Sequence, residues 1–320
     1  MPSRFAEAAA EAAIRIADVI CETPVVRSAH FSEVTGADVH FKLENRQHTG
    51  SFKLRGAANC LLSLSPGQRA RGVATASSGN HGAAVAYAMR ALDVPGVIFV
   101  PEQTSEAKVE AIRSYGGDVR FFGTDGLDTE LHAREYAESE GLFYVSPYND
   151  ANVVAGQGTC GIEIADQCAN LDAVFVAVGG GGLLGGVGSV LRRRLPDIRI
   201  FACQPEASAV MAKSVEAGRV LDLPSQPTLS DGTAGGVEAN AITFDLCREL
   251  ADEFVLVSED EIAAAMRAFI GAEKDTIEGS AGVAIAALER RREVIEGRKV
   301  LVIICGGNVS EATLEAVCGS

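Results

Sequence analysis

The chain has 320 residues, of which 47% are hydrophobic and 22% are charged, a composition typical of folded globular proteins that excludes disordered and fibrous classes. Its net charge is −15, which argues against a nucleic-acid partner held through phosphate contacts. No apolar run approaches the roughly 18 residues needed to span a bilayer, so we expect no membrane partner.

The chain begins with an Ala-rich amphipathic helix over residues 5–20, in which charged residues are spaced through the segment, unlike a signal peptide. After it, short apolar runs alternate with helical patterns over residues 105–115, 126–140, 259–271 and 279–291. The runs that we predict to be strands cover residues 39–43, 72–76, 97–100, 119–122, 142–145, 173–178, 198–203, 253–257 and 300–305. Strands that alternate with helices predict parallel sheets with helices on both faces.

Nine strands would make a large single sheet, and a Pro-containing passage at residues 146–149 separates the first five from the last four. We therefore favour two open, mostly parallel twisted sheets over one. We therefore expect an α/β protein with a small domain over residues 71–148. The larger domain would consist of residues 1–70 and 149–320. Residues 219–239 contain several Pro and Gly and show no periodicity, which predicts a long loop that is functional or mobile.

The eight cysteines are scattered, without a C-x-x-C pair. A zinc site is therefore not expected. A chain of this length does not need disulfides, and most of the cysteines have apolar neighbours, as reduced buried thiols do. We expect a cytoplasmic protein.

Lys53 directly precedes a helix rich in apolar residues. A lysine in an apolar pocket loses its proton more readily, which makes it a nucleophile or a Schiff-base former. The alternative is a solvated residue at the start of a helix, which is the more common situation for an isolated lysine.

A polar cluster follows the strand at residues 72–76 and precedes a helix. It contains Ser77, Ser78, Asn80 and His81, with Gly79 inside the cluster and Gly82 directly after it. The free N–H groups of that helix would suit a carboxylate. Helix capping alone would explain one of these side chains but not the whole cluster.

Glycines are concentrated after the strand at residues 173–178, where Gly179, Gly180, Gly181 and Gly182 lead into a helix. Such a turn presents backbone N–H groups and the positive end of a helix dipole, which together cradle a phosphate. Gly180, Gly182 and Gly185 also match the G-x-G-x-x-G pattern, with Glu206 about twenty residues further on, as in a dinucleotide site. An NAD-dependent oxidoreductase is therefore an alternative, and a simple packing turn is another.

The last predicted strand ends in Cys305, Gly306, Gly307 and Asn308. In open α/β sheets ligands bind beyond the carboxyl ends of the strands. Glycine-framed polar groups follow several predicted strands of this chain, and their convergence is hard to explain by packing.

Taken together, these segments resemble the fold type II pyridoxal-phosphate enzymes, which share a tryptophan synthase β-like fold, and within them the threonine/serine dehydratase and serine racemase family. The resemblance rests on residues 51–57, 77–82, 179–182, 258–262 and 305–308, which occur in the family's order over nearly the whole chain. It accounts for Lys53 and for the cluster at residues 77–81, which a dinucleotide site leaves unexplained.

The resemblance implies pyridoxal 5′-phosphate as the cofactor, with Lys53 bound covalently to it and moving the substrate's Cα proton. The other residues that would hold the cofactor are Phe52 beside the ring, Asn80 at the 3′-oxygen, Cys305 at the pyridine nitrogen, and Gly179, Gly180, Gly181 and Gly182 at the phosphate. The substrate carboxylate would be received by Ser77, Ser78, Asn80 and His81. The racemases of the family place their second catalytic base at the position of Ser78.

The resemblance further implies a β-elimination that converts a β-hydroxy amino acid, first of all L-threonine or L-serine, to a 2-oxo acid and ammonia. A hydroxyaspartate dehydratase and a serine or aspartate racemase are the alternatives within the family. A homodimer is also implied.

Several relatives bind a divalent cation through acidic residues after the strand that matches residues 198–203. Here Gln204 and Val210 occupy those positions, and Glu206 is the only acid close by. We therefore predict no metal site of this kind, or only a weak one.

Overall fold

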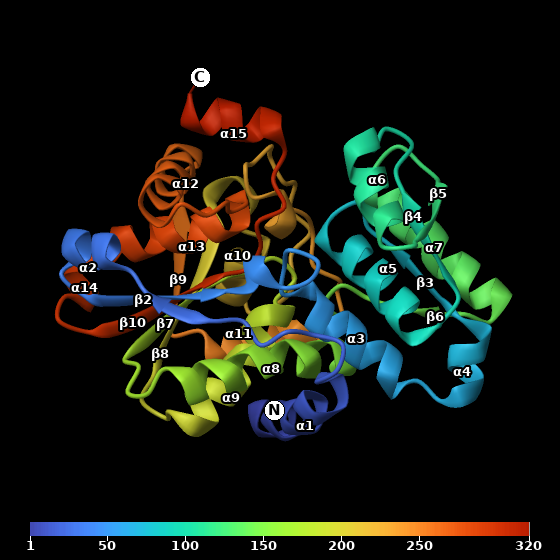
Figure 1. Cartoon of the computed structure of the whole chain (residues 1–320), viewed down its shortest axis with the longest axis horizontal. Coiled ribbons are helices and arrows are strands. Elements are labelled where there is room, and N and C mark those ends of the chain that lie inside the picture. Colours follow the sequence, from blue (N-terminus) through green and yellow to red (C-terminus); the bar gives the residue numbers. More distant parts are fainter. Residues whose placement is uncertain (320) are drawn as a thin grey trace.

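The structure is a computed structural model that describes residues 1–319. Figure 1 shows a larger body that contains both ends of the chain, and beside it a smaller body formed by the middle of the sequence. Each body has a sheet at its centre with helices on both faces. The predicted α/β class with two mostly parallel sheets is therefore confirmed.

The helices and strands follow the predicted alternation. The strands are β1 (Val25–Arg27), β2 (Asp38–Leu43), β3 (Val73–Ala76), β4 (Gly96–Val100), β5 (Asp118–Phe121), β6 (Phe143–Tyr144), β7 (Ala173–Ala177), β8 (Arg199–Pro205), β9 (Glu253–Val257) and β10 (Lys299–Ile304). The α-helices are α1 (Pro2–Ile16), α2 (Ala29–Thr35), α3 (Lys53–Ser63), α4 (Pro66–Arg71), α5 (Asn80–Leu92), α6 (Glu106–Ser114), α7 (Gly126–Glu140), α8 (Ala151–Gln167), α9 (Gly182–Arg194), α10 (Val210–Ala217), α11 (Ile242–Leu250), α12 (Glu259–Glu273), α13 (Gly279–Arg290), α14 (Arg292–Ile295) and α15 (Glu311–Cys318). Three short 3₁₀ helices are η1 (Glu44–Arg46), η2 (Glu206–Ser208) and η3 (Asp231–Thr233).

The larger sheet has six strands in the order β1-β2-β10-β7-β8-β9. All neighbours in it are parallel except β1, which pairs antiparallel with β2 at one edge. Its central strands are buried apolar runs, as expected for a sheet covered on both faces. Because these strands are parallel, β7 and β10 end on the same side of the sheet.

The smaller sheet has four parallel strands in the order β5-β4-β3-β6. The chain enters it from α3 and α4 and leaves it through residues 145–150 into α8. Strand β3 lies in its interior and ends at Ala76, directly before the polar cluster at residues 77–81.

Helix α8 was not predicted, and its glycines explain both why it was missed and how it packs. Gly156 and Gly158 lower the helix propensity of the segment. A Cβ on Gly156 would lie 2.4 Å from the carbonyl oxygen of Arg55 in α3, and one on Gly158 would lie 2.7 Å from the Cβ of Ala9 in α1. The glycines therefore let α1 and α3 approach α8 closely.

A buried charge cluster, formed by Lys42, Glu44, Arg55 and Glu163, joins β2, η1, α3 and α8. The Arg55 guanidinium is fully buried, and it donates to Glu44 at 2.8 Å and to Glu163 at 2.6 and 2.8 Å. Lys42 Nζ donates to Glu163 at 2.6 Å. Burial alone would raise the pKa of Glu44, but the charge and hydrogen bonds of Arg55 outweigh it and hold that pKa below its usual value. The cluster therefore fixes the start of α3 by charge-assisted hydrogen bonds.

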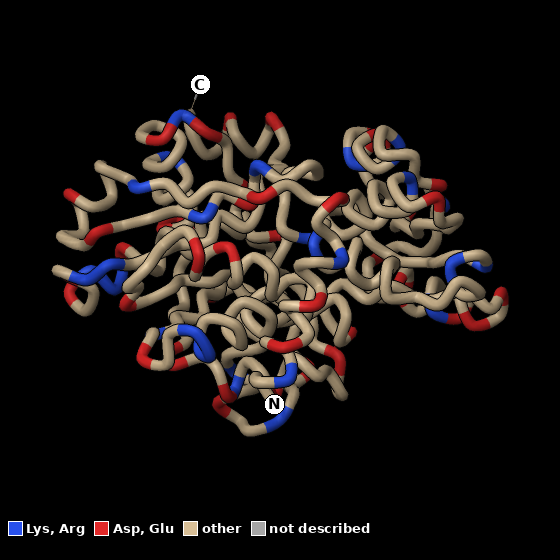
Figure 2. Tube along the Cα trace, turned by 60° about the horizontal axis from the view of Figure 1, so that its bottom comes forward, with Lys and Arg blue, Asp and Glu red and all other residues tan. Residues whose placement is uncertain are grey.

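The charges on the rest of the molecule are mixed in sign. Figure 2 shows Lys and Arg interspersed with Asp and Glu along the whole trace. Many of them form exposed ion pairs such as Arg193 with Glu7. None of the helices within residues 1–319 combines the length and the apolar character needed to cross a bilayer.

Candidate active site

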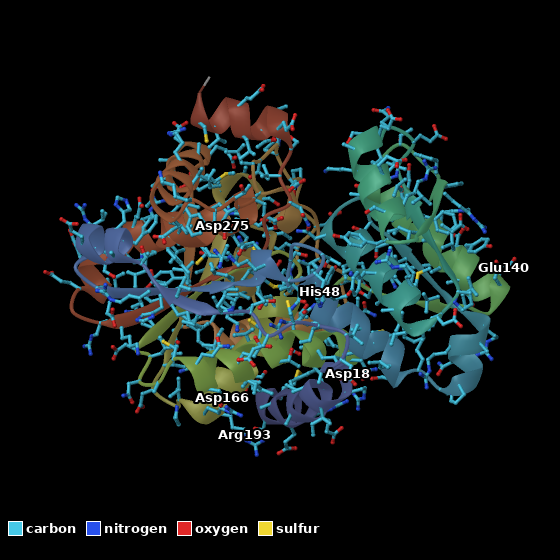
Figure 3. All side chains as sticks on the ribbon, in the orientation of Figure 1. Asp18, His48, Glu140, Asp166, Arg193 and Asp275 are labelled. Carbon is cyan, nitrogen blue, oxygen red and sulfur yellow. The ribbon has the colours of Figure 1, made fainter. Side chains whose placement is uncertain are left out.

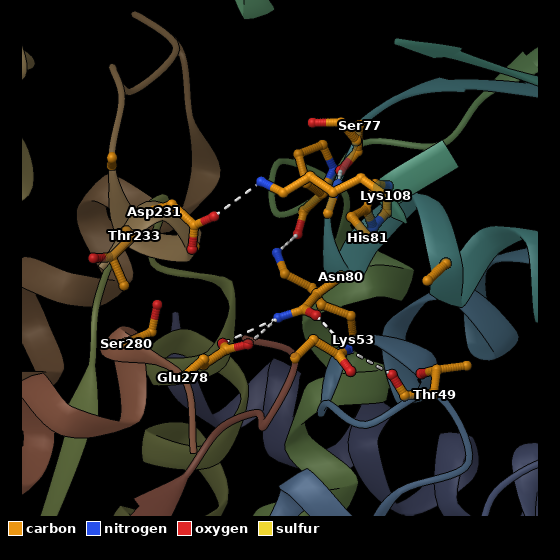
Figure 4. Close-up of a pocket in the computed structure, with 18 of the residues that line it drawn as sticks. Thr49, Lys53, Ser77, Asn80, His81, Lys108, Asp231, Thr233, Glu278 and Ser280 are labelled. Atoms are coloured by element: carbon orange, nitrogen blue, oxygen red, sulfur yellow. Dashed lines mark hydrogen bonds and ion pairs between the residues drawn. The ribbon is translucent and has the colours of Figure 1, made fainter. Parts of the chain in front are cut away.

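A cavity of about 720 Å³ lies where β3, β7 and β10 end, between the two sheets. Figure 4 shows Lys53 and Asn80 facing Glu278, Thr233 and Asp231 across it. The residues singled out from the sequence are separated by up to 253 positions along the chain. They all line this cavity: Phe52, Lys53, Ser77, Ser78, Asn80, His81, Gly179, Gly180, Gly181, Gly182 and Cys305.

Lys53 is the first residue of α3, and the backbone before it is tied to the end of β10. The Phe52 N–H donates to the Cys305 carbonyl at 3.0 Å, and the Gly307 N–H donates to the Gly50 carbonyl at 2.9 Å. Lys53 Nζ donates to the Pro147 carbonyl at 3.1 Å. Burial lowers the pKa of Lys53 to about 8, although Cys305 and Glu278 act in the opposite direction. Near pH 8 a large fraction of this amine is therefore unprotonated and can act as a base or nucleophile.

The glycine loop connects β7 to α9 as predicted, and side chains would not fit in it. Gly181 has φ of +84°, in the region that glycine tolerates best. A Cβ on Gly180 would lie 2.3 Å from the ring of Tyr148, and one on Gly179 would lie 2.9 Å from the Cα of Thr233. The first N–H groups of α9 point out of a helix N-terminus beside this backbone, which is the geometry that binds a phosphate.

No side chain of the polar cluster at residues 77–81 caps α5. The N-cap residue is Gly79, without a side-chain hydrogen bond to the helix. Ser77 Oγ instead accepts from the Gly79 N–H at 3.2 Å, and Ser77 and Ser78 are half-buried. Both hydroxyls line the cavity beside the start of α5.

His81 differs from its neighbours because it is buried and already has a partner. Its Nε2 lies 3.0 Å from the Val145 carbonyl oxygen, which can only accept, so Nε2 carries the proton. Burial, with the nearby Lys53, lowers the pKa of His81 to about 3, so the ring is neutral. Its remaining nitrogen, Nδ1, is a buried acceptor without a hydrogen-bond partner among the described residues. An acceptor nitrogen is poorly suited to contact a carboxylate directly.

Cys305 follows β10, and its buried side chain has a carboxylate as its neighbour. Burial, reinforced by Glu278, raises the pKa of the Cys305 thiol well above its usual value, so the thiol keeps its proton. Its Sγ lies 3.9 Å from Glu278 Oε1. Glu278 was not singled out from the sequence, since a single Glu before a predicted helix carries no local signal.

The mouth of the cavity was only partly anticipated. The loop over residues 219–239 contributes Asp231 and Thr233 to the lining, and its functional role stays a prediction. Lys108 on α6 reaches across to Asp231 at 3.2 Å. A second contact between the two bodies involves His48, labelled in Figure 3, which stacks on Tyr87 of α5 with ring centroids 5.5 Å apart.

The predicted absence of a metal site stays a prediction. Within residues 1–319 the structure brings together no three His, Cys, Asp or Glu that could hold a metal ion. Gln204 accepts from the Ala212 N–H at 2.7 Å, and Glu206 pairs with Arg290 at 3.3 Å. Adding magnesium to chelated protein should therefore leave the melting temperature within about 1 °C of its starting value, since only a ligand that binds the folded state stabilises it. A rise of several degrees would contradict the prediction.

Comparisons with known proteins point to one family. The profile of the family described as pyridoxal-phosphate dependent enzyme matches residues 16–306. The catabolic L-threonine dehydratase of Escherichia coli (strain K12) is 37% identical over 311 residues, which cover 97% of this chain and 94% of that protein.

Solved structures agree. The processed form of threonine deaminase isoform 2 from Solanum lycopersicum matches with a TM-score of 0.93 and 34% identity, covering 98% of this chain and 92% of that one. Serine racemase from Dictyostelium discoideum matches with a TM-score of 0.88 and 35% identity, covering 95% and 98% of the two chains. These likenesses leave the alternative of a dinucleotide-dependent oxidoreductase without support.

Proposed function

Because the chain belongs to the family of pyridoxal-phosphate dependent enzymes, we propose that it is an ammonia-lyase acting on a β-hydroxy amino acid, with L-threonine and L-serine as the first candidates. The observation that carries the proposal is Lys53, whose amine faces the cavity with its pKa lowered to about 8 by burial. The likeness to a threonine dehydratase over nearly the whole chain supports the substrate class.

The side chains present fit this cofactor. The glycine loop presents backbone without side chains to the cavity, next to the N-terminus of α9. We propose that Gly179, Gly180, Gly181 and Gly182 hold the phosphate, Asn80 the 3′-oxygen and Cys305 the pyridine nitrogen, with Phe52 beside the ring. Pyridoxal phosphate, when bound, supplies an electron-withdrawing ring that acidifies the Cα–H of an attached amino acid.

Lys53 is the proposed catalytic base. Its unprotonated Nζ accepts the Cα proton of the substrate, and burial keeps a useful fraction of the amine in that form. We propose that the hydroxyls of Ser77 and Ser78 and the start of α5 receive the substrate carboxylate, since these groups are donors at one wall of the cavity. We propose for His81 a supporting role in this wall, because its only free nitrogen is an acceptor.

The net reaction removes the Cα proton and the β-hydroxyl group, so water leaves, and hydrolysis of the resulting enamine gives a 2-oxo acid and ammonia. Cys305 contributes a neutral thiol where a carboxylate would keep the pyridine nitrogen protonated. With a neutral partner at the pyridine nitrogen, the cofactor ring withdraws electrons from the substrate Cα less strongly. This would favour elimination of a β leaving group over reactions that need a longer-lived carbanion.

A racemase is the second candidate, and Ser78 is the observation that favours it. Its hydroxyl lines the same cavity as Lys53, so it is a candidate for a second base that returns a proton to Cα. A hydroxyaspartate dehydratase remains a variant of the first candidate. It would need a cation for the second carboxylate, and Lys108 at the cavity mouth is one.

We also propose the domain boundaries, the cellular location and the oligomeric state of the protein. We propose that residues 71–148 form a small domain and residues 1–70 with 149–320 a large one, supported by the separate four- and six-stranded sheets. We propose a cytoplasmic protein, supported by free thiols at all eight cysteines. We propose a homodimer on the strength of the family resemblance alone.

A substrate screen tests the proposed function. Purified protein loaded with pyridoxal phosphate is given L-serine, L-threonine, hydroxyaspartate and phenylserine, and the 2-oxo acid and ammonia are measured, with chiral analysis of the remaining amino acid. Equal amounts of 2-oxo acid and ammonia from threonine or serine are expected. Formation of the D-isomer without ammonia would replace the lyase by the racemase, and a protein that does not bind the cofactor would overturn both.

A further inference from the structure

Glu278 is the N-cap residue of α13, but its side chain does not cap that helix. The carboxylate instead lines the cavity, although the residue is only 4% exposed. Its backbone is held in place, because the Glu278 N–H donates to the Gly306 carbonyl at 3.1 Å. The Glu278 backbone is therefore joined to the segment that carries Cys305, and its side chain lies in the same cavity.

The carboxylate binds two side chains that we assign to the cofactor. Asn80 Nδ2 donates to Glu278 Oε1 and Oε2 at 3.0 and 2.8 Å (Figure 4). Asn80 Oδ1 accepts from Asn308 Nδ2 at 2.7 Å, so the amide plane is fixed from both sides. The Cys305 thiol is the second partner, with its Sγ 3.9 Å from Oε1.

No cation is paired with this carboxylate among the described residues, since the ion pairs of residues 1–319 do not include Glu278. A buried carboxylate without an ion-pair partner is costly for folding. Groups of this kind are concentrated at functional sites.

The charged and titratable groups around Glu278 are few. They are Lys53 on α3, Asp231 on η3 and the Cys305 thiol after β10. Burial raises the pKa of Glu278 to about 7, helped by Asp231 and opposed by the Asn80 hydrogen bonds and by Lys53.

We propose that Glu278 is a cofactor-positioning residue, which orients the Asn80 amide and the Cys305 thiol toward two different positions on the cofactor ring. The proposal rests on the proposed function, because it presumes that this cavity binds pyridoxal phosphate. A thiol has a single proton, so the Cys305 S–H donates either to Glu278 or to the pyridine nitrogen. A charged Glu278 accepts this hydrogen bond itself, and the thiol is free to donate to the ring only while Glu278 is protonated.

The test measures cofactor affinity rather than turnover. Apoprotein of wild type and Glu278→Gln is titrated by equilibrium dialysis with pyridoxal phosphate and with pyridoxamine phosphate, which carries an amine where the aldehyde would react with a lysine. We expect Glu278→Gln to raise the Kd for pyridoxamine phosphate about tenfold, because a charge-assisted hydrogen bond that orients Asn80 is weakened. Glu289→Gln is the matched control: it changes the same residue type on the same helix, away from the cavity, and its Kd should equal that of wild type.

Two further measurements separate positioning from a purely structural role. Glu278→Gln apoprotein should melt at pH 8 at or above the wild-type temperature, because the substitution removes a buried charge. In the double variant Glu278→Gln/Asn80→Ala, the Kd for pyridoxamine phosphate should equal that of the single variant that binds it more weakly. The reason is that both substitutions disrupt the same contact, the hydrogen bonds between Glu278 and Asn80. Independent, multiplicative effects on Kd would overturn the proposal.

An unchanged Kd in Glu278→Gln would also overturn it, while leaving the proposed function intact. A wild-type protein that binds neither pyridoxal compound would instead overturn the proposed function itself.

Discussion

Replacing Lys53 with alanine is expected to lower kcat by at least about 10³-fold, since it removes both the covalent attachment and the proposed base. The variant should also lose its cofactor on dialysis, which the wild type resists. Because the pKa of Lys53 is lowered to about 8, the rate at which wild-type apoprotein takes up pyridoxal phosphate covalently should increase as pH rises through about 8. Stopped-flow absorbance measures that rate, and a 2-oxo acid assay measures turnover.

Lys108→Ala is the matched control for retention of the cofactor. It removes the other lysine that lines the cavity, one that is 48% exposed and paired with Asp231. This variant should keep its cofactor through dialysis. If Lys108→Ala lost the cofactor and Lys53→Ala kept it, the covalent role would belong to Lys108.

Arg55→Met is expected to destabilise the apoprotein by about 3–5 kcal/mol, because it leaves the buried carboxylate of Glu44 and the partly buried carboxylate of Glu163 with Lys42 as their only remaining cation. The chain has no tryptophan, so urea unfolding is best followed by circular dichroism. The pKa of Glu44 is depressed in the folded protein. Its contribution is therefore present above the ordinary pKa of a Glu and is lost as pH falls through the folded pKa, so the difference between wild type and variant should shrink in acid.

Arg193→Ala is the control for Arg55→Met. Arg193 pairs with Glu7 at the edge of the molecule labelled in Figure 3, and both side chains are more than half exposed. Its loss should cost less than about 1 kcal/mol. A similar small loss in Arg55→Met would show that the buried charge cluster contributes little to stability.

The strands were predictable because a parallel sheet buried on both faces requires continuous apolar runs. All nine predicted strands are present, and each end lies within two residues of its predicted position. The one strand that was not predicted is β1, a three-residue antiparallel edge strand that is too short to leave a pattern. Helix α8 was missed because its glycines lower the local helix propensity. These glycines are there to allow close contact with α1 and α3, which the local sequence does not show.

Within the site, the sequence identified groups that follow strands and are framed by glycines, because that context is local. Glu278 and Lys108 lack such a context. They reach the cavity only because the topology brings α13 and α6 to it. The orientation of the His81 ring could not be predicted from the sequence either, because it depends on a hydrogen bond to the Val145 carbonyl, 64 positions further along the chain.

The buried charge cluster has a consequence for the order of folding. Arg55 and Glu163 are 108 positions apart, and the four-stranded sheet lies between them in the sequence. In that sheet Val73 pairs with Phe143, so once it has formed, the loop that must close to join Arg55 and Glu163 is roughly a third as long, which lowers the entropic cost of closure by about 1 kcal/mol. We expect the inserted sheet to fold first, and substitutions within it to slow the assembly of a cluster that they never touch.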